Sequence, residues 1–219
     1  MKIIPRTLLL TCFLLPALPL SSAAQKPKPP LPVEVLFGHD RFFFQMEVIK
    51  KFSEQSRFGL LSIATFAADY RNDMRENSLT IPVQVNYTFK KGFGVMAGVE
   101  NNDAVGFSPT LGPQHVYASR TFLAVTVASY FLNGNNDLGL FGLYEYRPPI
   151  GKGWSLYSRL QFIYNQNLSE GQHNRSFVYL RGGLKKDQLI FGVGANLDQY
   201  GPEKSVGKNY GLFVRWEFN

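Results

Sequence analysis

The feature of this sequence that most restricts its fold is an alternation of apolar and polar residues along most of the chain. In the segment 76–89, the odd positions from Leu79 to Phe89 are all apolar, and the even positions are polar except for Pro82. Successive side chains of a strand point to opposite faces, so this period of two predicts a strand with one apolar and one polar face. Pro82 removes one ladder hydrogen bond without interrupting the pattern.

Further segments carry the same pattern with varying regularity. They are Val33–Gly38, Phe42–Phe52, Arg57–Tyr70, Phe93–Asn101, Thr110–Tyr117, Thr121–Leu132, Leu138–Arg147, Trp154–Asn165, Arg175–Leu184, Gln188–Asp198 and Asn209–Phe218. After the N-terminal segment, no apolar run reaches the roughly 20 residues that a membrane helix needs. The chain contains 19 Phe, 11 Tyr and 20 Gly but one Cys. We therefore predict an all-β protein and exclude helical membrane proteins, disulfide scaffolds and cysteine-ligated metal sites.

The first 24 residues have the composition of an export signal. Lys2 and Arg6 precede a Leu-rich stretch, and Ser22-Ala23-Ala24 supplies the small residues that a signal peptidase requires. We expect residues 1–24 to be cleaved as a signal peptide, which would also remove the single cysteine, Cys12. Residues 25–32 contain four prolines and are expected to form an extended linker. The folded domain would then span residues 33–219.

The segments between the predicted strands alternate between two kinds. One kind is short and mostly basic: 53–56, 90–92, 118–120, 148–152 and 185–187. The other kind is polar and mostly longer: 71–75, 102–108, 133–137, 166–174 and 199–207. Short turns at one end and longer loops at the other are typical of a transmembrane antiparallel β-barrel. The count predicts twelve strands, with ten as an alternative if Val33–Phe37 does not pair or if 110–132 is a single strand pair.

The C-terminal strand provides a resemblance to a known class of proteins. Tyr210, Gly211, Val214, Trp216 and Phe218 form an alternating run that ends on an aromatic residue, with only Asn219 after it. This run resembles the terminal assembly signal of small Gram-negative outer-membrane β-barrel proteins. The resemblance implies insertion into the outer membrane by the barrel-assembly machinery, which would bind this last strand, with outer-membrane lipid as the surrounding partner. It identifies the class and no individual member.

The polar faces of the predicted strands would line the lumen of such a barrel. The residues that we expect there are Glu47, Glu145, Arg159, Gln161, Tyr179, Arg181, Arg215 and Glu217. Three of the charged residues are acidic and three are basic. A barrel of twelve strands lies between the filled interior of eight strands and the open channel of sixteen, so we expect these charges to pair across it. On the opposite faces, Trp154, Tyr164, Trp216 and Phe218 are expected to meet lipid near the interfaces.

The sequence contains little that indicates catalysis. His39, His115 and His173 are not at metal-ligand spacing, so we predict no metal and no cofactor. Outer-membrane phospholipases and lipid A deacylases use a His and a Ser two residues apart, whereas His173 and Ser176 are three apart. Spacing of three places them on opposite faces of a regular strand, so a bulge would be needed to bring them together. Glu170 and Asn174 could complete such a set.

Three functional hypotheses follow from these observations. The first is an outer-membrane barrel that forms a narrow small-solute channel or has a structural role. The second is an outer-membrane lipid hydrolase or deacylase that uses His173 and Ser176, so enzymatic activity stays open. The third is a soluble periplasmic lipocalin-like binding barrel. The net charge of +7 is compatible with an anionic lipid surface. Nucleic acid is not an expected partner, because the protein is predicted to be exported and its Lys and Arg residues are scattered.

Overall fold

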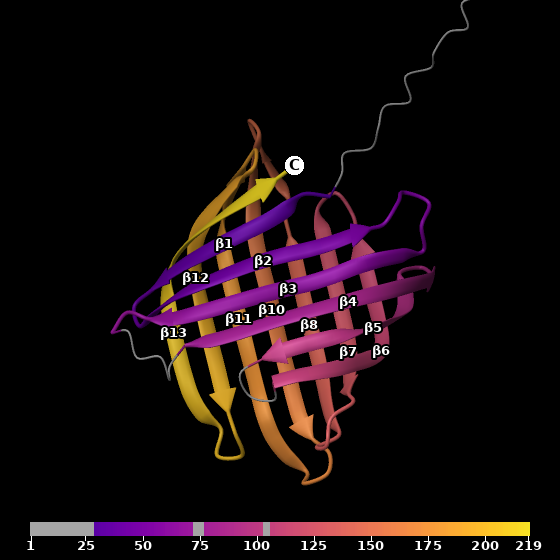
Figure 1. The fold of residues 1–219 in the computed structure, drawn as a ribbon. Helices are drawn as coiled ribbons and strands as arrows, with labels where there is room; N and C mark the ends of the chain where they lie inside the picture. The colour runs from indigo at the N-terminus through magenta and orange to yellow at the C-terminus, as the bar shows by residue number, and fades with distance from the viewer. Residues whose placement is uncertain (1–28, 72–76, 103–105) are drawn as a thin grey trace, which may run out of the picture.

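The computed structural model describes residues 29–71, 77–102 and 106–219, which form an antiparallel β-barrel (Figure 1). The strands are β1 (Leu31–Gly38), β2 (Arg41–Lys51), β3 (Phe58–Asp69), β4 (Ser78–Lys90), β5 (Phe93–Asn102), β6 (Gly106–Ala118), β7 (Phe122–Phe131), β8 (Asp137–Tyr146), β9 (Pro149–Gly151), β10 (Trp154–Asn167), β11 (Gln172–Lys186), β12 (Leu189–Tyr200) and β13 (Ser205–Phe218). Within these described ranges, no helix is long and apolar enough to cross a membrane. The expected signal peptide and residues 25–28 of the expected linker lie outside the described residues, and the last two linker positions, Leu31 and Pro32, belong to β1.

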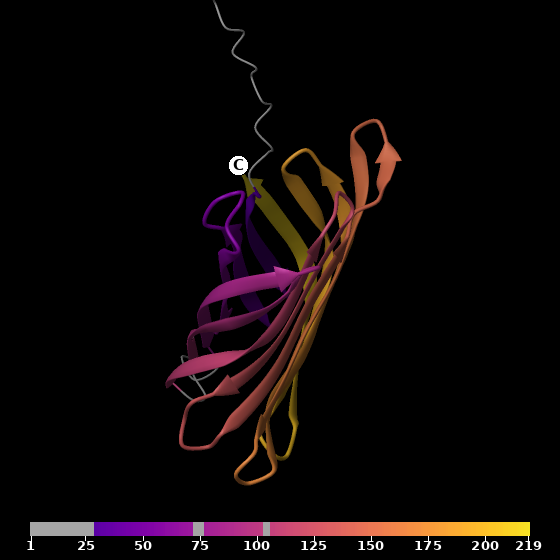
Figure 2. The ribbon, with the colours of Figure 1, turned by 90° about the vertical axis from the view of Figure 1, so that its right-hand side faces the viewer.

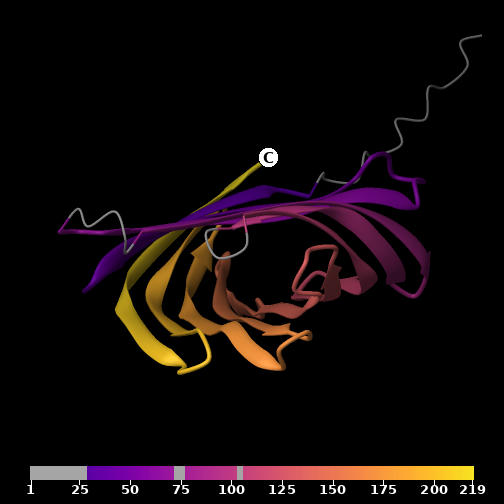
Figure 3. The same cartoon turned by 60° about the horizontal axis from the view of Figure 1, so that its bottom comes forward.

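The barrel closes through the pairing of its first strand with its last. β1 pairs antiparallel with β13 over the full length of β1, from Leu31 opposite Phe218 to Gly38 opposite Gly211. The other long strands pair with their neighbours in the sequence, and β8 pairs directly with β10. In the described residues the wall therefore has twelve strands, which confirms the predicted number and excludes ten. Figure 3 shows a closed and flattened ring, in which the indigo to magenta strands form the flatter side.

One short strand was not predicted. β9 falls within the segment 148–152, which we expected to be only a turn, and pairs with the start of β10 through Gly151 opposite Trp154. A strand of three residues is too short to show a period of two, and this one lies at the rim, outside the closed wall.

The predicted lengths of two of the polar loops are wrong. Where the sequence suggested long polar loops at 166–174 and 199–207, the strands continue into them and leave only residues 168–171 and 201–204 as turns. Polar residues such as Asn167 and Gln172 pair across the β10–β11 ladder, since backbone hydrogen bonds do not depend on side-chain polarity. Figure 2 shows the extended hairpins at the lower end of the barrel, with the orange β10–β11 hairpin among the longest.

The strands present apolar side chains to the outside. On β13, Tyr210, Leu212, Val214 and Trp216 are 43–65% exposed, whereas Phe213 and Arg215 are almost completely buried inside. The same alternation exposes Leu, Ile, Val and Phe side chains on the other strands. An apolar outer wall of this extent is characteristic of a barrel that faces lipid.

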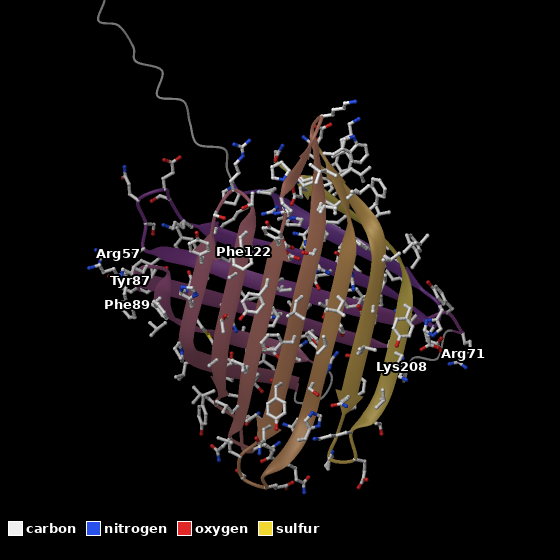
Figure 4. The ribbon with its side chains drawn as sticks, turned by 180° about the vertical axis from the view of Figure 1, so that it is seen from behind. Arg57, Arg71, Tyr87, Phe89, Phe122 and Lys208 are labelled. Atoms are coloured by element: carbon white, nitrogen blue, oxygen red, sulfur yellow. The ribbon has the colours of Figure 1, made fainter. Side chains whose placement is uncertain are left out.

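Aromatic residues gather at the end of the barrel where β1 begins and β13 ends. Exposed rings at this end are Phe58, Phe89, Phe93, Tyr117, Tyr146, Trp216 and Phe218. Figure 4 labels Arg57, Tyr87 and Phe89 together at this rim, where Arg57 Nη1 donates to the Tyr87 hydroxyl over 3.3 Å. Exposed Tyr164 and Tyr210 lie toward the opposite end. Aromatic residues toward both ends of an apolar wall correspond to the girdles of transmembrane barrels.

Candidate functional site

The inner face of the barrel brings six buried charged residues into one group. We call this group the lumen cluster: Glu34, Glu47, Glu145, Arg159, Arg181 and Arg215. They come from β1, β2, β8, β10, β11 and β13, and each is at most 3% exposed. Because opposite walls of the barrel contribute to it, the lumen cluster spans the interior. Its formal charges cancel.

Arg159 on β10 joins two strands of the opposite wall. Its Nη2 donates to Glu34 Oε1 over 2.6 Å, and its Nη1 donates to Glu47 Oε1 over 3.2 Å. β10 is hydrogen-bonded to β8, β9 and β11 and not to β1 or β2, so these ion pairs cross the lumen. Arg181 Nε donates to the same Glu34 Oε1 over 2.8 Å. Glu34 therefore balances part of the positive charge of both Arg159 and Arg181.

Arg215 makes the second half of the lumen cluster. It binds Glu47 through two bonds, Nη1 to Oε1 over 2.6 Å and Nη2 to Oε2 over 3.1 Å. The same Nη1 lies 2.9 Å from Glu145 Oε1, which also accepts from the Tyr157 hydroxyl over 2.9 Å. Paired, two-pronged contacts of this kind are the strong form of the arginine–carboxylate interaction. Glu47 therefore accepts from both Arg159 and Arg215, which share its Oε1.

Neutral side chains extend the lumen cluster. Gln45 Nε2 donates to Glu47 Oε1 over 2.9 Å and to Gln161 Oε1 over 3.0 Å. Gln45 therefore links Glu47 to Gln161, which is one of the predicted lumen residues. Arg181 Nη1 donates to Asn196 Oδ1 over 2.8 Å. A Cβ at Gly194 would lie 2.9 Å from Arg181 Cδ, so glycine at this position leaves the space that the Arg181 side chain occupies. A Cβ at Gly192 would likewise meet the backbone oxygen of Gly182 on β11.

Two of the predicted lumen residues are not members of the lumen cluster, but one of them is connected to it. Glu217 pairs with Arg147 over 3.0 Å and with Lys185, near the end of β13, and Arg147 Nε lies 4.0 Å from Glu145 Oε2 in the lumen cluster. The Tyr179 hydroxyl donates to Asp198 Oδ1 over 2.9 Å, and Arg175 donates to the same oxygen over 3.1 Å. Glu217 therefore extends the lumen cluster through Arg147, whereas Tyr179 belongs to a separate polar group with Asp198 and Arg175.

The remainder of the interior contains two apolar groups and further buried polar side chains, among them Gln84, Thr110 and Gln114. One buried group contains Leu36, Phe43, Tyr157, Phe177, Tyr179, Ile190 and Phe213, and another contains Leu61, Ile63, Met96, Val125, Val127 and Leu143. A cavity of about 90 Å³ lies against the second group and extends toward the end opposite the chain termini. Gln161 lines this cavity as well as bonding to Gln45. The cavity therefore borders the lumen cluster, which stands between it and the end of the barrel that holds the chain termini.

Glu34 and Gln45 are functional candidates that the sequence analysis missed. The signal was available, because Glu34 alternates with Val33 and Val35 in a segment that we treated only as a possible first strand. Once β1 is known to close the barrel against β13, the same alternation places Glu34 inside. The ends of short strands are the positions where a period of two is hardest to recognise.

The structure also brings His173 and Ser176 together. The β10–β11 ladder shifts register so that Gln166 pairs with His173 while Asn165 pairs with Arg175, which leaves Asn174 as the extra residue of a bulge. His173 Nε2 then lies 3.1 Å from Ser176 Oγ. The Asn174 side chain donates to Asp137 Oδ1, and Glu170 is exposed in the turn, where its backbone N–H donates to Asn167 Oδ1. Among the described residues, no group of three or more His, Cys, Asp and Glu side chains could hold a metal ion.

Comparison with known proteins yields matches of structure and not of sequence. No protein-family model and no curated protein sequence matches the chain. The solved NanC porin aligns with a TM-score of 0.51 and 10% identity, covering 86% of this chain and 99% of NanC. The chain therefore shares the β-barrel fold of a porin. KdgM porin aligns with a TM-score of 0.47 and 14% identity over 86% of this chain and 99% of KdgM. The predicted class-level resemblance to Gram-negative outer-membrane barrels is confirmed as a resemblance of fold.

Proposed function

We propose that this protein forms a narrow small-solute channel in the outer membrane, with the lumen cluster as its constriction. The observation that carries the proposal is the network from Glu34 through Arg159 and Glu47 to Arg215, which joins opposite walls. Ions and small neutral solutes would pass only where water and side-chain movement open a path between these charges. The NanC porin has the same fold, in agreement with a channel.

The residues on the outer surface of the barrel support its placement in a membrane. The exposed apolar wall and the aromatic residues toward both ends suit a lipid bilayer, whereas a soluble lipocalin-like barrel would present polar residues to water. We infer that residues 1–24 direct export and are removed. The chain termini and the adjacent short turns would then face the periplasm, and the opposite end would face outward. The last strand, with Trp216 and Phe218, would be the part that the assembly machinery binds.

The balance of charge in the lumen cluster distinguishes this channel from a general porin. An open general porin keeps a water-filled passage, while here the buried acids and bases neutralise one another in a filled interior. A confined charge without a partner is costly, so each variant that removes one charge should alter both stability and ion selectivity. The channel would therefore show low conductance and weak selectivity.

Two measurements test this proposal. The first is fractionation combined with gel migration of the unboiled protein in detergent. A closed barrel should fractionate with the outer membrane and migrate differently before and after boiling, because its backbone groups pair internally. The second is planar-bilayer recording on the refolded protein, where small conductance steps are expected. Recovery in the soluble periplasmic fraction, or conductance as large as that of a trimeric general porin, would contradict the proposal.

A further inference from the structure

The bulge in β11 places a histidine and a serine side by side on the outer wall. Ser176 pairs with Tyr164 on one neighbouring strand and Gln199 on the other, and both of these side chains are exposed outside the barrel. The next residue, Phe177, is buried in the interior, as alternation requires. His173 is 7% exposed and its ring lies 5.7 Å from the Tyr164 ring. The pair therefore lies on the lipid-facing side, near the end opposite the chain termini.

The second ring nitrogen of His173 determines how the pair is protonated. His173 Nδ1 lies 2.8 Å from the backbone oxygen of Gly201. A carbonyl oxygen can only accept, so Nδ1 carries the proton and the Nε2 of a neutral ring has a free lone pair. The Ser176 hydroxyl donates to Gln199 Oε1 over 3.2 Å, and rotation about its C–O bond would turn its proton to the lone pair of Nε2, which lies 3.1 Å from Oγ. This is the arrangement in which a histidine acts as general base toward a serine nucleophile.

A shallow groove runs over the outer wall beside Ser176. Its outward-facing lining includes Ser176, Val178, Leu197, Gln199, Val206 and Lys208. Val178, Leu197 and Val206 provide apolar surface, and Lys208 provides a cation. Lys208 is labelled in Figure 4, on the yellow strand β13. An acyl chain and an anionic headgroup are the two chemical features that this lining would bind.

We propose that His173 and Ser176 form a serine hydrolase site for ester-linked acyl chains of membrane lipids. Ser176 Oγ attacks the ester carbonyl carbon while its proton moves to His173 Nε2. The bond from the carbonyl carbon to the alcohol oxygen breaks, and His173 returns the proton to that oxygen. Water then attacks the acyl-serine, His173 accepts a proton from the water and passes it to Ser176 Oγ, and a carboxylic acid leaves. This inference rests on the proposed placement of the barrel in a lipid bilayer.

The Gln199 side chain completes the arrangement. Ser176 Oγ donates to Gln199 Oε1 over 3.2 Å, so the carboxamide is adjacent to the reacting oxygen. After rotation of the amide, its Nε2 would donate to the negative charge that develops on the carbonyl oxygen of the substrate. One such donor contributes about 100-fold or more to the rate in acyl transfer. Gln199→Ala should accordingly lower kcat more than it changes KM.

The test uses the full barrel refolded in detergent micelles, with a short-chain p-nitrophenyl ester and a diacyl phospholipid as substrates. A fluorophosphonate probe, followed by peptide mass spectrometry, reports directly on an activated serine. We expect ester hydrolysis by the wild-type barrel and labelling at Ser176. Ser176→Ala should abolish both. His173→Gln, which keeps a donor for the Gly201 carbonyl, should lower kcat by about 100-fold or more. Ser158→Ala is the matched control, because Ser158 is an exposed serine on the neighbouring strand.

The outcomes separate this inference from the channel. If a wild-type barrel of normal heat-modifiability shows no labelling of Ser176 and no hydrolysis above that of Ser176→Ala, the hydrolase inference is overturned. Ser176→Ala should leave the conductance of the barrel unchanged, because the serine lies outside the lumen. Hydrolysis in micelles without any conductance would support the hydrolase site and contradict the channel.

Discussion

Arg159 Nη2 lies 2.6 Å from Glu34 Oε1, and this ion pair joins β10 to β1 across the inside of the barrel. Both side chains are at most 2% exposed. Glu34 also accepts from Arg181, so it is the acid on which two arginines depend. A buried acid that serves two bases is more sensitive to substitution than an acid in a single exposed pair.

Replacing Glu34 with Gln should destabilise the folded barrel. The substitution keeps the shape of the side chain but leaves Arg159 and Arg181 with one fewer compensating charge in a buried position. Breaking a buried pair in this way costs about 3–5 kcal/mol. Urea unfolding of the refolded protein, followed by tryptophan fluorescence, measures the difference. Glu203→Gln, in the exposed turn between β12 and β13, is the control and should leave the unfolding midpoint unchanged.

A side chain at position 194 should displace Arg181. Gly194→Val would place its Cβ 2.9 Å from Arg181 Cδ and 3.0 Å from Leu36 Cδ1, so the guanidinium would have to move away from Glu34. Overpacking of this kind costs about 1–3 kcal/mol. The control is Gly182→Ala, because a Cβ at Gly182 meets no atom within 4 Å. Equal unfolding midpoints for the two variants would show that Gly194 does not provide space for Arg181.

Removing the last four residues should prevent assembly. Trp216, Glu217 and Phe218 pair with Val33, Pro32 and Leu31, so the deletion of 216–219 takes away the end of the seam that closes the barrel. The deletion would also remove Glu217, which forms ion pairs with Arg147 and Lys185. We expect the deleted protein to lose the heat-modifiable band on gels and to accumulate as an unfolded species. Wild-type levels of folded barrel would contradict the role assigned to this strand.

The two tryptophans should report on lipid contact. Trp216 is 43% exposed on the outer wall, and Trp154 stands at the start of β10 with Lys186 Nζ 5.1 Å from its ring centre. Both lie at the end of the barrel that holds the chain termini, so they should meet the same lipid interface. Phospholipids that carry bromine near the headgroup should quench them more strongly than lipids brominated deep in the chain. The opposite depth dependence would contradict this interfacial assignment.

The strand pattern could be predicted because alternation is a local property of the sequence. Each strand segment, from Val33–Gly38 to Asn209–Phe218, corresponds to an observed strand. The ends of the strands could not be predicted, because backbone pairing continues through polar residues such as Asn167 and Gln172. For the same reason the supposed long loops became extended hairpins.

The candidate site could be predicted only in part. Alternation indicated which charges face inward, and thus included Glu47, Glu145, Arg159, Arg181 and Arg215. Which charge meets which depends on the stagger of strands around the closed wall, and this is a property of the whole barrel. Tyr179 consequently belongs to another group, and Glu217 joins the lumen cluster only through Arg147. The contact between His173 and Ser176 depends on the bulge at Asn174, which the regular spacing of the sequence does not encode.

The most direct test of the lumen cluster is the single-channel conductance of the double variant Arg159→Ala/Arg181→Ala beside that of the wild type. The substitutions remove two bulky side chains and two positive charges from the constriction, and leave Glu34 without its two arginine partners. We predict a higher conductance and a shift toward cation selectivity, with retention of heat-modifiability as the check on folding. A folded double variant with the conductance and ion selectivity of the wild type would contradict the assignment of the lumen cluster as the constriction.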